Sequence, residues 1–264
     1  MSTATIYLEG LSLLGPGMND WAEAAPRLLG QQPFQAEEVR LAAPAILPAT
    51  ERRRAGTAVK LSMAVGLAAV EDAGAEAAQL PNVFSSTGGD CENCHSLLEV
   101  LASSERMVSP TRFHNSVHNA PAGYWGIATQ CTEASTSLCA YDATFGAGLL
   151  ETVTQAHSAG KPCLLISFDT AYPEPLHALR PIPYPLGVGM VLSPVRTAAS
   201  KAALRLSFSQ EAPTTMDDAQ LEALRQSIPS ARCLPLLRLL ASGQPGRVVI
   251  DYLDDCRLAI ELTA

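Results

Sequence analysis

The sequence predicts an α/β protein in which a mainly parallel sheet carries helices on both faces. Short apolar runs alternate with stretches of helical periodicity, which is the pattern of β-α-β units. The run PCLLISFD at 162–169 is apolar without alternation, as in a strand covered on both faces. The chain has 264 residues, of which 47% are hydrophobic and 17% charged, so it can form a sizeable core.

Most of this pattern lies in the first 198 residues. Residues 5–15 alternate like a strand and end in Gly-Pro-Gly, and 19–30 predict a short helix with Asn19 or Asp20 as its N-cap. The strongest helical periodicity lies at 50–74, with Gly74 just past its end. Further elements are expected at 80–87 (strand), 95–104 and 143–160 (helices), and 162–169 and 187–194 (strands).

The last part of the chain, residues 199–264, has a different pattern. Strands are expected at 202–209, 246–253 and 256–263 around one helix at 216–228. The last two strands flank Asp254 and Asp255, which favours a hairpin. We therefore divide the chain into a larger part, 1–198, and a smaller part, 199–264, packed on the same core.

Charge and composition exclude several partners. The formal net charge is −8 and no block of Lys or Arg could follow a nucleic-acid backbone, so nucleic acid is not expected. An acidic carrier would also be repelled unless a local basic patch attracts it. The N-terminus lacks a basic leader and no apolar run reaches about 20 residues, so we expect a cytoplasmic protein without a membrane span. The seven cysteines are odd in number and irregularly spaced, which favours free thiols.

Two short motifs could bind a metal. CENCH at 91–95 has the spacing of a haem-attachment site, but that chemistry needs export, and no second Cys or His pair completes a zinc site. HNSVH at 114–118 pairs two histidines, but Asn115 stands where a zinc protease needs Glu. A polar loop and hydrogen-bonding histidines are the better interpretations, and we expect no metal and no cofactor.

The segment STSLCAYDATFGAG, 135–148, predicts the start of a buried helix that carries Cys139. A thiol at a helix N-terminus can be activated as a nucleophile by the helix dipole. A free cysteine is also often a small buried apolar residue. The residues alone do not decide whether Cys139 is a nucleophile or a buried packing residue.

Six segments in order resemble the N-terminal half of the β-ketoacyl synthases of the thiolase fold. The resemblance covers about residues 4–195. The matching segments are IYLEGLSLLGPGMNDWAEAAPRLLGQ, ERRRAGTAVKLSMAVGLAAVEDAG, LPNVFSSTGGD, SPTRFHNSVHNAPAG, TSLCAYDATFGAGLLETVTQAHSAGKPCLLISFDT and LGVGMVLSP. This resemblance implies a thiolase-like fold whose second half is truncated to a few strands and a helix.

The chain departs from this family at the residues that perform the chemistry. A full ketosynthase continues into a second half with two catalytic histidines and a lysine, but no histidine follows His177 here. The family's glycine lies eight residues after its nucleophile, and counting back from Gly146 gives Leu138. Cys139, the alternative, would then be turned by about 100° on a helix. The chain is most similar to the chain-length factors, especially the short ketosynthase-like subunit of aryl polyene biosynthesis, and this implies no activity alone.

The resemblance also implies a partner, a full-length ketosynthase in a heterodimer, with an acyl carrier protein involved indirectly. It implies that PCLLISF at 162–168 pairs with its counterpart across the two-fold axis. A small thiol acyltransferase that uses Cys139 is the alternative function. The residues expected at the partner interface or acyl tunnel are Arg112, Phe113, His114, Asn115, His118, Asn119, Leu164 and Ile166.

Overall fold

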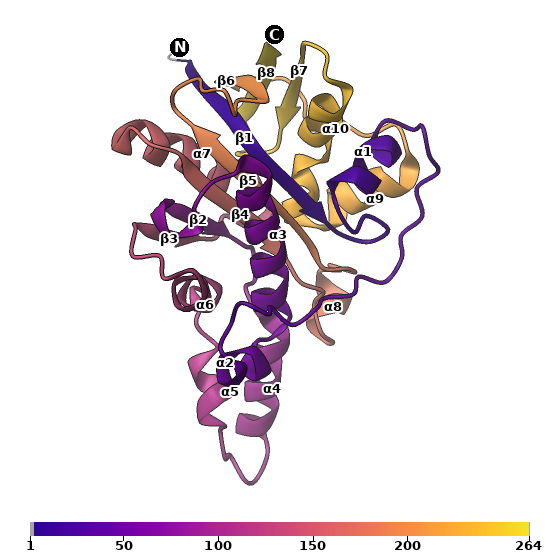
Figure 1. The fold of residues 1–264 in the computed structure, drawn as a ribbon. Coiled ribbons are helices and arrows are strands. Elements are labelled where there is room, and N and C mark those ends of the chain that lie inside the picture. Colours follow the sequence, from indigo (N-terminus) through magenta and orange to yellow (C-terminus); the bar gives the residue numbers. More distant parts are fainter. Residues whose placement is uncertain (1–2, 264) are drawn as a thin grey trace.

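The computed structural model describes residues 3–263, which form one mixed sheet with helices on both faces (Figure 1). The strands are β1 (Ala4–Leu14), β2 (Asn82–Ser85), β3 (Ser135–Leu138), β4 (Cys163–Asp169), β5 (Leu186–Ser193), β6 (Ala202–Ser209), β7 (Gly246–Ile250) and β8 (Arg257–Thr263). The helices are α1 (Trp21–Leu28), α2 (Ala49–Arg54), α3 (Thr57–Ala73), α4 (Cys91–Ala102), α5 (Pro110–His114), α6 (Ala120–Thr129), α7 (Thr144–Ala159), α8 (Leu176–Leu179), α9 (Ala219–Ser227) and α10 (Leu234–Ser242). Short 3-10 turns are η1 (Ala77–Gln79), η2 (Tyr141–Ala143) and η3 (Pro229–Cys233).

The sheet is mixed, so the prediction of a mainly parallel sheet is wrong. Its strand order is β3-β2-β4-β5-β1-β6-β8-β7. The pairings of β2 with β3 and β4 are parallel, and the other pairings of the described residues are antiparallel. The reason is visible between β4 and β5, where the connection holds only the four-residue helix α8. A parallel neighbour is usually reached through a crossover that contains a full-length helix, and α8 is too short to supply one, so β5 returns antiparallel to β4.

Two apolar layers enclose the sheet (Figure 1). Helices α3 and α6 cover one face, where Trp125 and Ile166 belong to the same buried cluster. Helices α7, α9 and α10 cover the other face, around buried residues such as Phe145. A Cβ at Gly189 would lie 2.4 Å from the carbonyl oxygen of Val65, so a glycine in β5 permits α3 to lie directly on the sheet.

Three expected elements differ from the structure. The helix expected at 50–74 breaks at Gly56, where a Cβ would lie 2.4 Å from Oδ2 of Asp90. The CENCH segment is the first turn of α4, capped by the Asp90 side chain, and is not a polar loop. The C-terminal part contains α10 in addition to the expected helix. The β7–β8 hairpin is confirmed, and the division at residue 198 stays a prediction.

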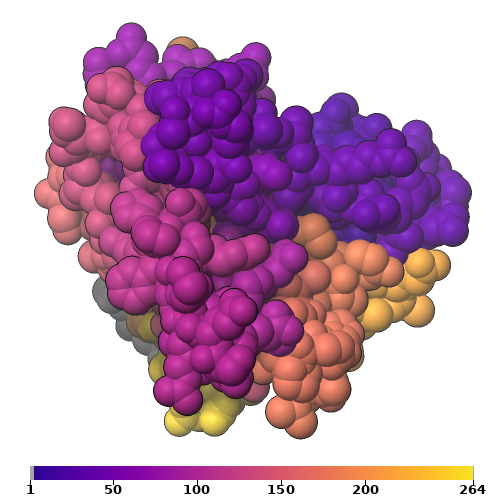
Figure 2. Space-filling view, turned by 90° about the horizontal axis from the view of Figure 1, so that it is seen from below, coloured from indigo at the N-terminus to yellow at the C-terminus, as the bar shows by residue number. Residues whose placement is uncertain are grey.

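Helices α2, α4 and α5 form an arm that projects from the sheet beyond the N-terminal end of α3 (Figure 1). Figure 2 views the molecule from the tip of this arm, and the orange segment around α8 lies beside the magenta α4–α5 region. None of the helices in the described residues is long and apolar enough to cross a membrane.

Candidate functional site

The segment that the sequence assigned to a nucleophile-bearing helix is a strand followed by a sharp turn. Leu138 is the last residue of β3, and its carbonyl oxygen accepts a hydrogen bond from the N–H of Ser86 at 3.2 Å. Cys139 lies in the turn, and α7 begins only at Thr144. The expected helical offset of about 100° between Leu138 and Cys139 is therefore wrong, because neither residue is helical.

The turn is held in an uncommon backbone conformation. Tyr141 has a φ of 52°, which a non-glycine residue adopts at a cost of about 1–3 kcal/mol unless its surroundings hold it there. The hydroxyl of Thr144 accepts from the N–H of Ala140 at 3.1 Å and donates to the carbonyl oxygen of Tyr141 at 2.6 Å. Such strained backbone is common where a fold aims a residue at a reaction centre.

The charged side chain of Arg180, from the connection between β4 and β5, packs on this turn. The guanidinium carbon of Arg180 lies 3.6 Å from the ring centroid of Tyr141, and Arg180 also forms an ion pair with Asp142. Arg180 reaches the hydroxyl of Thr87 at 3.5 Å. A cation stacked on an aromatic ring thus lies directly beside the turn.

Cys139 has no activating partner among the described residues. Its side chain is exposed, and its thiol donates to the carbonyl oxygen of Thr87 with an S···O distance of 3.2 Å. None of the five histidines forms a hydrogen bond to it. A cysteine nucleophile needs a base or a cation that favours the thiolate. The contacts of Cys139 supply neither.

A buried carboxylate, Asp169, organises the backbone around the site. It ends β4 and accepts the N–H of Thr87 at 2.8 Å and the N–H of Ser230 at 2.7 Å. Burial raises the pKa of Asp169 to about 6, although these bonds and Arg180 oppose the shift. Both carboxylate oxygens face backbone amides, so Asp169 joins the Thr87 loop to the C-terminal part and is not placed as a catalytic base.

The two cysteines of CENCH lie in the first turn of α4. Burial raises the pKa of Cys91 to about 11 and also raises the pKa of Cys94. Metal-binding cysteines are thiolates, so these shifts disfavour binding at this pair. No group of three or more His, Cys, Asp or Glu residues in the described part of the chain is arranged to hold a metal ion.

The predicted interface residues of α5 and the following turn divide into two sets. Asn115 is buried, donates to the carbonyl oxygen of Arg54 at 3.1 Å and accepts from the Tyr124 hydroxyl at 3.1 Å. His118 has its Nε2 2.9 Å from the carbonyl oxygen of Ser86. Asn115 thus joins the arm to α6, and His118 joins the segment after α5 to the end of β2. The outward set, with exposed side chains, is Arg112, Phe113, His114 and Asn119.

Leu164 and Ile166 are wrongly assigned to a partner interface. Both side chains are fully buried within this chain. Their strand, β4, is paired on one edge with β2 and on the other with β5, so it has no free edge for a second subunit. The strand with a free edge at this end of the sheet is β3.

Asp169 and Arg180 are site residues that were not predicted from the sequence. Asp169 could have been found, because a carboxylate directly follows the apolar run CLLISF at the end of a buried strand. Arg180 lies in a connection interrupted by prolines, and nothing in its surroundings in the sequence predicts that it covers the turn after β3.

An open groove of about 500 Å³ lies between α6 and β3. It is lined by His118, Asn119, Ala122, Gly123, Ser135 and Ser137. The groove therefore connects Asn119, one of the exposed residues of the predicted interface, to the free edge of β3.

Several solved structures have this fold over nearly the whole chain. One, described as the ketosynthase ApeO in complex with its chain length factor ApeC from Xenorhabdus doucetiae, aligns over 97% of this chain and 99% of its own, with a TM-score of 0.74 at 21% identity. A chain of the ishigamide ketosynthase/chain length factor aligns over 98% and 99%, with a TM-score of 0.68 at 15% identity. A chain of AntDE:AntF, described as a type II PKS acyl-carrier protein in complex with its ketosynthase bound to the hexaketide, aligns over 100% of both, with a TM-score of 0.74 at 11% identity.

These alignments confirm the expected α/β thiolase-like fold, with the mixed sheet described above. No curated protein matches the sequence. Residues 21–247 match the family described as beta-ketoacyl synthase, N-terminal domain, which is most of the chain. The chain therefore belongs to the beta-ketoacyl synthase family.

Proposed function

We propose that this protein is a non-catalytic, chain-length-factor-like subunit that pairs with an active β-ketoacyl-ACP synthase in the cytoplasm. In this role it shapes the partner's acyl tunnel during polyene or fatty-acid-like chain elongation. The observation that carries the proposal is the turn after β3, where Arg180 stacks on Tyr141 and the Cys139 thiol contacts only a carbonyl oxygen. The chains aligned above come from complexes of ketosynthases, two of them with a chain length factor.

The residues present after His177 support the same conclusion. Condensation needs a nucleophile and groups that move protons and stabilise developing charge. No histidine follows His177, and the residues after it supply β6, α9, α10, β7 and β8 as structural elements. The side chains around the turn after β3 form ion pairs and hydrogen bonds with one another, as the Arg180–Asp142 pair does.

The partner surface in this proposal centres on the free edge of β3. The carbonyl oxygens of Ala134 and Leu138 accept from β2 and its continuation, so the alternate residues Ser135 and Ser137 direct their backbone N–H and C=O groups to the open side. An unpaired strand edge is a template for pairing with another chain. A partner strand here would extend the sheet beyond β3.

Exposed apolar side chains on the arm and on α6 support this surface. They are Leu98, Leu101, Met107, Phe113, Val117 and Ile127, with between 44% and 80% of each residue exposed. Exposed apolar groups gathered on neighbouring elements mark interaction sites. Together with the β3 edge they form a surface for an obligate partner, for which we expect an interface on the order of 2,000 Å² or more.

Within this surface Arg112, Phe113, His114 and Asn119 are the residues proposed to reach the partner's tunnel. Phe113 is the largest apolar side chain of the set and is 69% exposed. One methylene of misfit in an apolar pocket changes binding by about 1–3 kcal/mol, so a wall residue can limit chain length without taking part in the chemistry.

A cluster of basic residues at the base of the arm supports the involvement of an acidic acyl carrier protein as an indirect partner in the complex. Arg53, Arg54, Lys60 and Arg112 line an open depression of about 470 Å³, together with Asp90 and Glu92. This is a local excess of positive charge in a chain with a net charge of −8. Such a patch raises the encounter rate with an anionic partner, an effect that salt weakens.

Co-expression with a full-length candidate ketosynthase from the same source tests the proposal. The expected result is that a tag on either subunit retains both, that this chain alone gives no condensation product, and that the ketosynthase makes a different product distribution with and without it. Equal product amount and length in both cases would overturn the proposed function.

A further inference from the structure

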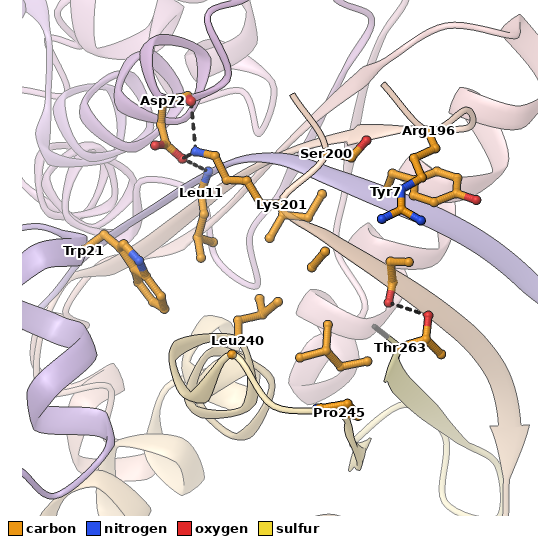
Figure 3. Close-up of a pocket in the computed structure, with 15 residues that line it drawn as sticks. Tyr7, Leu11, Trp21, Asp72, Arg196, Ser200, Lys201, Leu240, Pro245 and Thr263 are labelled. Atoms are coloured by element: carbon orange, nitrogen blue, oxygen red, sulfur yellow. Dashed lines mark hydrogen bonds and ion pairs between the residues drawn. The ribbon is translucent and has the colours of Figure 1, made fainter. Parts of the chain in front are cut away.

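A pocket of about 280 Å³ lies where strand β6 separates from strand β1 (Figure 3). Strand β1 runs from Ala4 to Leu14, but β6 pairs only with its first five residues, Ala4–Leu8. Beyond Leu8 this edge of β1 has no strand beside it. The N–H of Leu11 instead donates to Oδ2 of Asp72 at 2.8 Å, so a side chain replaces the missing strand and leaves an open space next to it.

The pocket has an apolar wall and a basic rim. Leu11, Trp21, Leu240 and Pro245 form the wall. Figure 3 shows Trp21, Leu240 and Pro245 across the pocket from the charged side chains, and Leu11 next to Asp72. Lys201 forms an ion pair with Asp72 and also donates to its carbonyl oxygen at 2.9 Å. The charge of Lys201 is thus neutralised within the rim.

Arg196 supplies the remaining charge. It lines the pocket together with Tyr7 and is exposed, and it forms no ion pair or hydrogen bond with the side chains of residues 3–263. A guanidinium presents a planar fork that matches a carboxylate with two parallel hydrogen bonds. A cation without a partner among residues 3–263, above an apolar wall, selects a ligand with one negative charge and an apolar body.

A second apolar pocket continues along the same edge of β1. Its volume is about 340 Å³, and it shares Leu11, Trp21 and Asp72 with the first. Its other lining residues include Leu13, Leu14 and Ala68. An apolar tail whose head lies at Arg196 can therefore pass beneath Trp21 along the unpaired part of β1.

We propose that this pocket binds a medium-chain fatty carboxylate, with its carboxylate at Arg196 and its tail on Trp21 and Leu240. A pocket near the lower end of the usual range of roughly 300–1,000 Å³ favours a small ligand of this kind. The pocket lies at β1, β6 and β8, whereas β3 is separated from β1 by β2, β4 and β5. Binding here does not compete with the proposed partner surface and does not depend on the proposed function.

Octanoate is the probe, measured by isothermal titration calorimetry with the full-length protein. Arg196→Gln is expected to weaken binding roughly 10- to 100-fold, the loss of a hydrogen bond to a charged group. Arg40→Gln removes the same charge from an exposed loop outside the pocket and is expected to bind like wild type. Ala203→Leu, which adds bulk to a lining residue, is expected to block binding.

Tryptophan fluorescence locates the ligand. The chain has two tryptophans, and Trp125 is buried in the layer beneath α3 and α6. Octanoate is expected to change the emission of wild type, and Trp21→Phe is expected to remove that change while calorimetry still detects binding. No detectable octanoate binding, equal binding of 1-octanol and octanoate, or equal effects of Arg196→Gln and Arg40→Gln would overturn the proposal.

Discussion

The two edge strands of the sheet, β3 and β7, differ in how their open sides are covered. At β7 the chain covers its own edge: the N–H of Thr214 donates to the carbonyl oxygen of Val249 at 2.8 Å, and the N–H of Val249 donates to the Thr214 hydroxyl at 2.9 Å. At β3 no segment of the described residues lies against Ser135 and Ser137 in this way. An unpaired edge is a template for pairing with another chain, so the proposed partner would join the sheet at β3 and not at β7.

The largest expected effect follows from a proline at the open edge. Ser137→Pro removes an N–H that faces away from β2, so the β2–β3 pairing remains while pairing with a second chain is blocked. We expect Ser137→Pro to abolish co-purification with the ketosynthase, while circular dichroism and the melting temperature of this subunit stay unchanged.

Two controls accompany this variant. Ser137→Ala removes the hydroxyl but keeps the N–H, and it is expected to retain the partner. Thr136→Pro interrupts the internal pairing with β2 and is expected to lower the melting temperature. If Ser137→Pro still retained the partner at the wild-type level, β3 pairing would not be part of the interface.

Asp169, the last residue of β4, connects the Thr87 loop to Ser230 in the C-terminal part of the chain. Asp169→Ala leaves the buried N–H of Ser230 and the half-buried N–H of Thr87 without their acceptor. An unsatisfied buried group costs roughly 1–3 kcal/mol, so we expect a loss of about 1–3 kcal/mol in the free energy of unfolding, chiefly from Ser230. Urea denaturation measures it, and a loss below 1 kcal/mol would show that water replaces the carboxylate without strain.

The same carboxylate predicts a pH dependence. Its pKa rises from 3.8 in the reference state to about 6 in the fold because burial disfavours its charge. Its contribution to stability is therefore fully present below pH 4 and is lost as the pH rises through about 6. Between pH 7.5 and pH 5 we expect the free energy of unfolding to increase, and we expect Asp169→Asn to reduce this slope. A wild-type slope of the opposite sign, unchanged in Asp169→Asn, would contradict the assignment.

At β7 we expect a smaller loss in the free energy of unfolding. Thr214→Val removes the hydroxyl that accepts from Val249 while keeping the shape of the side chain, and we expect a loss of about 1 kcal/mol. Thr215→Val, one residue further along in an exposed position, is the matched control and should change stability by less than 0.5 kcal/mol. Neither variant should affect retention of the ketosynthase. Loss of the partner in Thr214→Val alone would place the interface at the β7 edge and contradict the proposed interface at β3.

Local periodicity predicted the elements whose side chains alternate between core and solvent or are wholly buried. The strand at 162–169 and the helix at 143–160 are examples, and β4 and α7 begin and end within one residue of them. Strand direction was not predictable from such patterns, since β4 has the same apolar sequence whether β5 returns parallel or antiparallel. That choice depends on whether the connection contains a helix that can cross the sheet, and α8, with four residues, is too short to do so.

The candidate site was predictable in part. The sequence located the turn near Leu138 and Cys139, but its backbone depends on contacts between distant residues. Arg180 lies 39 positions after Tyr141 in the chain and stacks on its ring, and Asp169 binds Thr87 and Ser230 from segments on either side of it in the sequence. Pairings across such separations leave no periodic signal, which explains why the helical assignment of Cys139 failed.

The smallest expected effect concerns Cys139. If the turn is an inactive remnant, Cys139→Ala changes neither the product of the heterodimer nor the stability of this chain by more than about 0.5 kcal/mol, because its side chain is exposed. Intact-mass analysis after incubation with an acyl thioester should find no adduct on the wild-type protein. An adduct that disappears in Cys139→Ala would show that Cys139 is a working nucleophile despite its contact with Thr87. The protein would then be interpreted as a thiol acyltransferase and not as a non-catalytic subunit. Alkylation of the exposed thiol with iodoacetamide is the control that proves Cys139 accessible, so that a missing acyl adduct reports missing activation and not missing access.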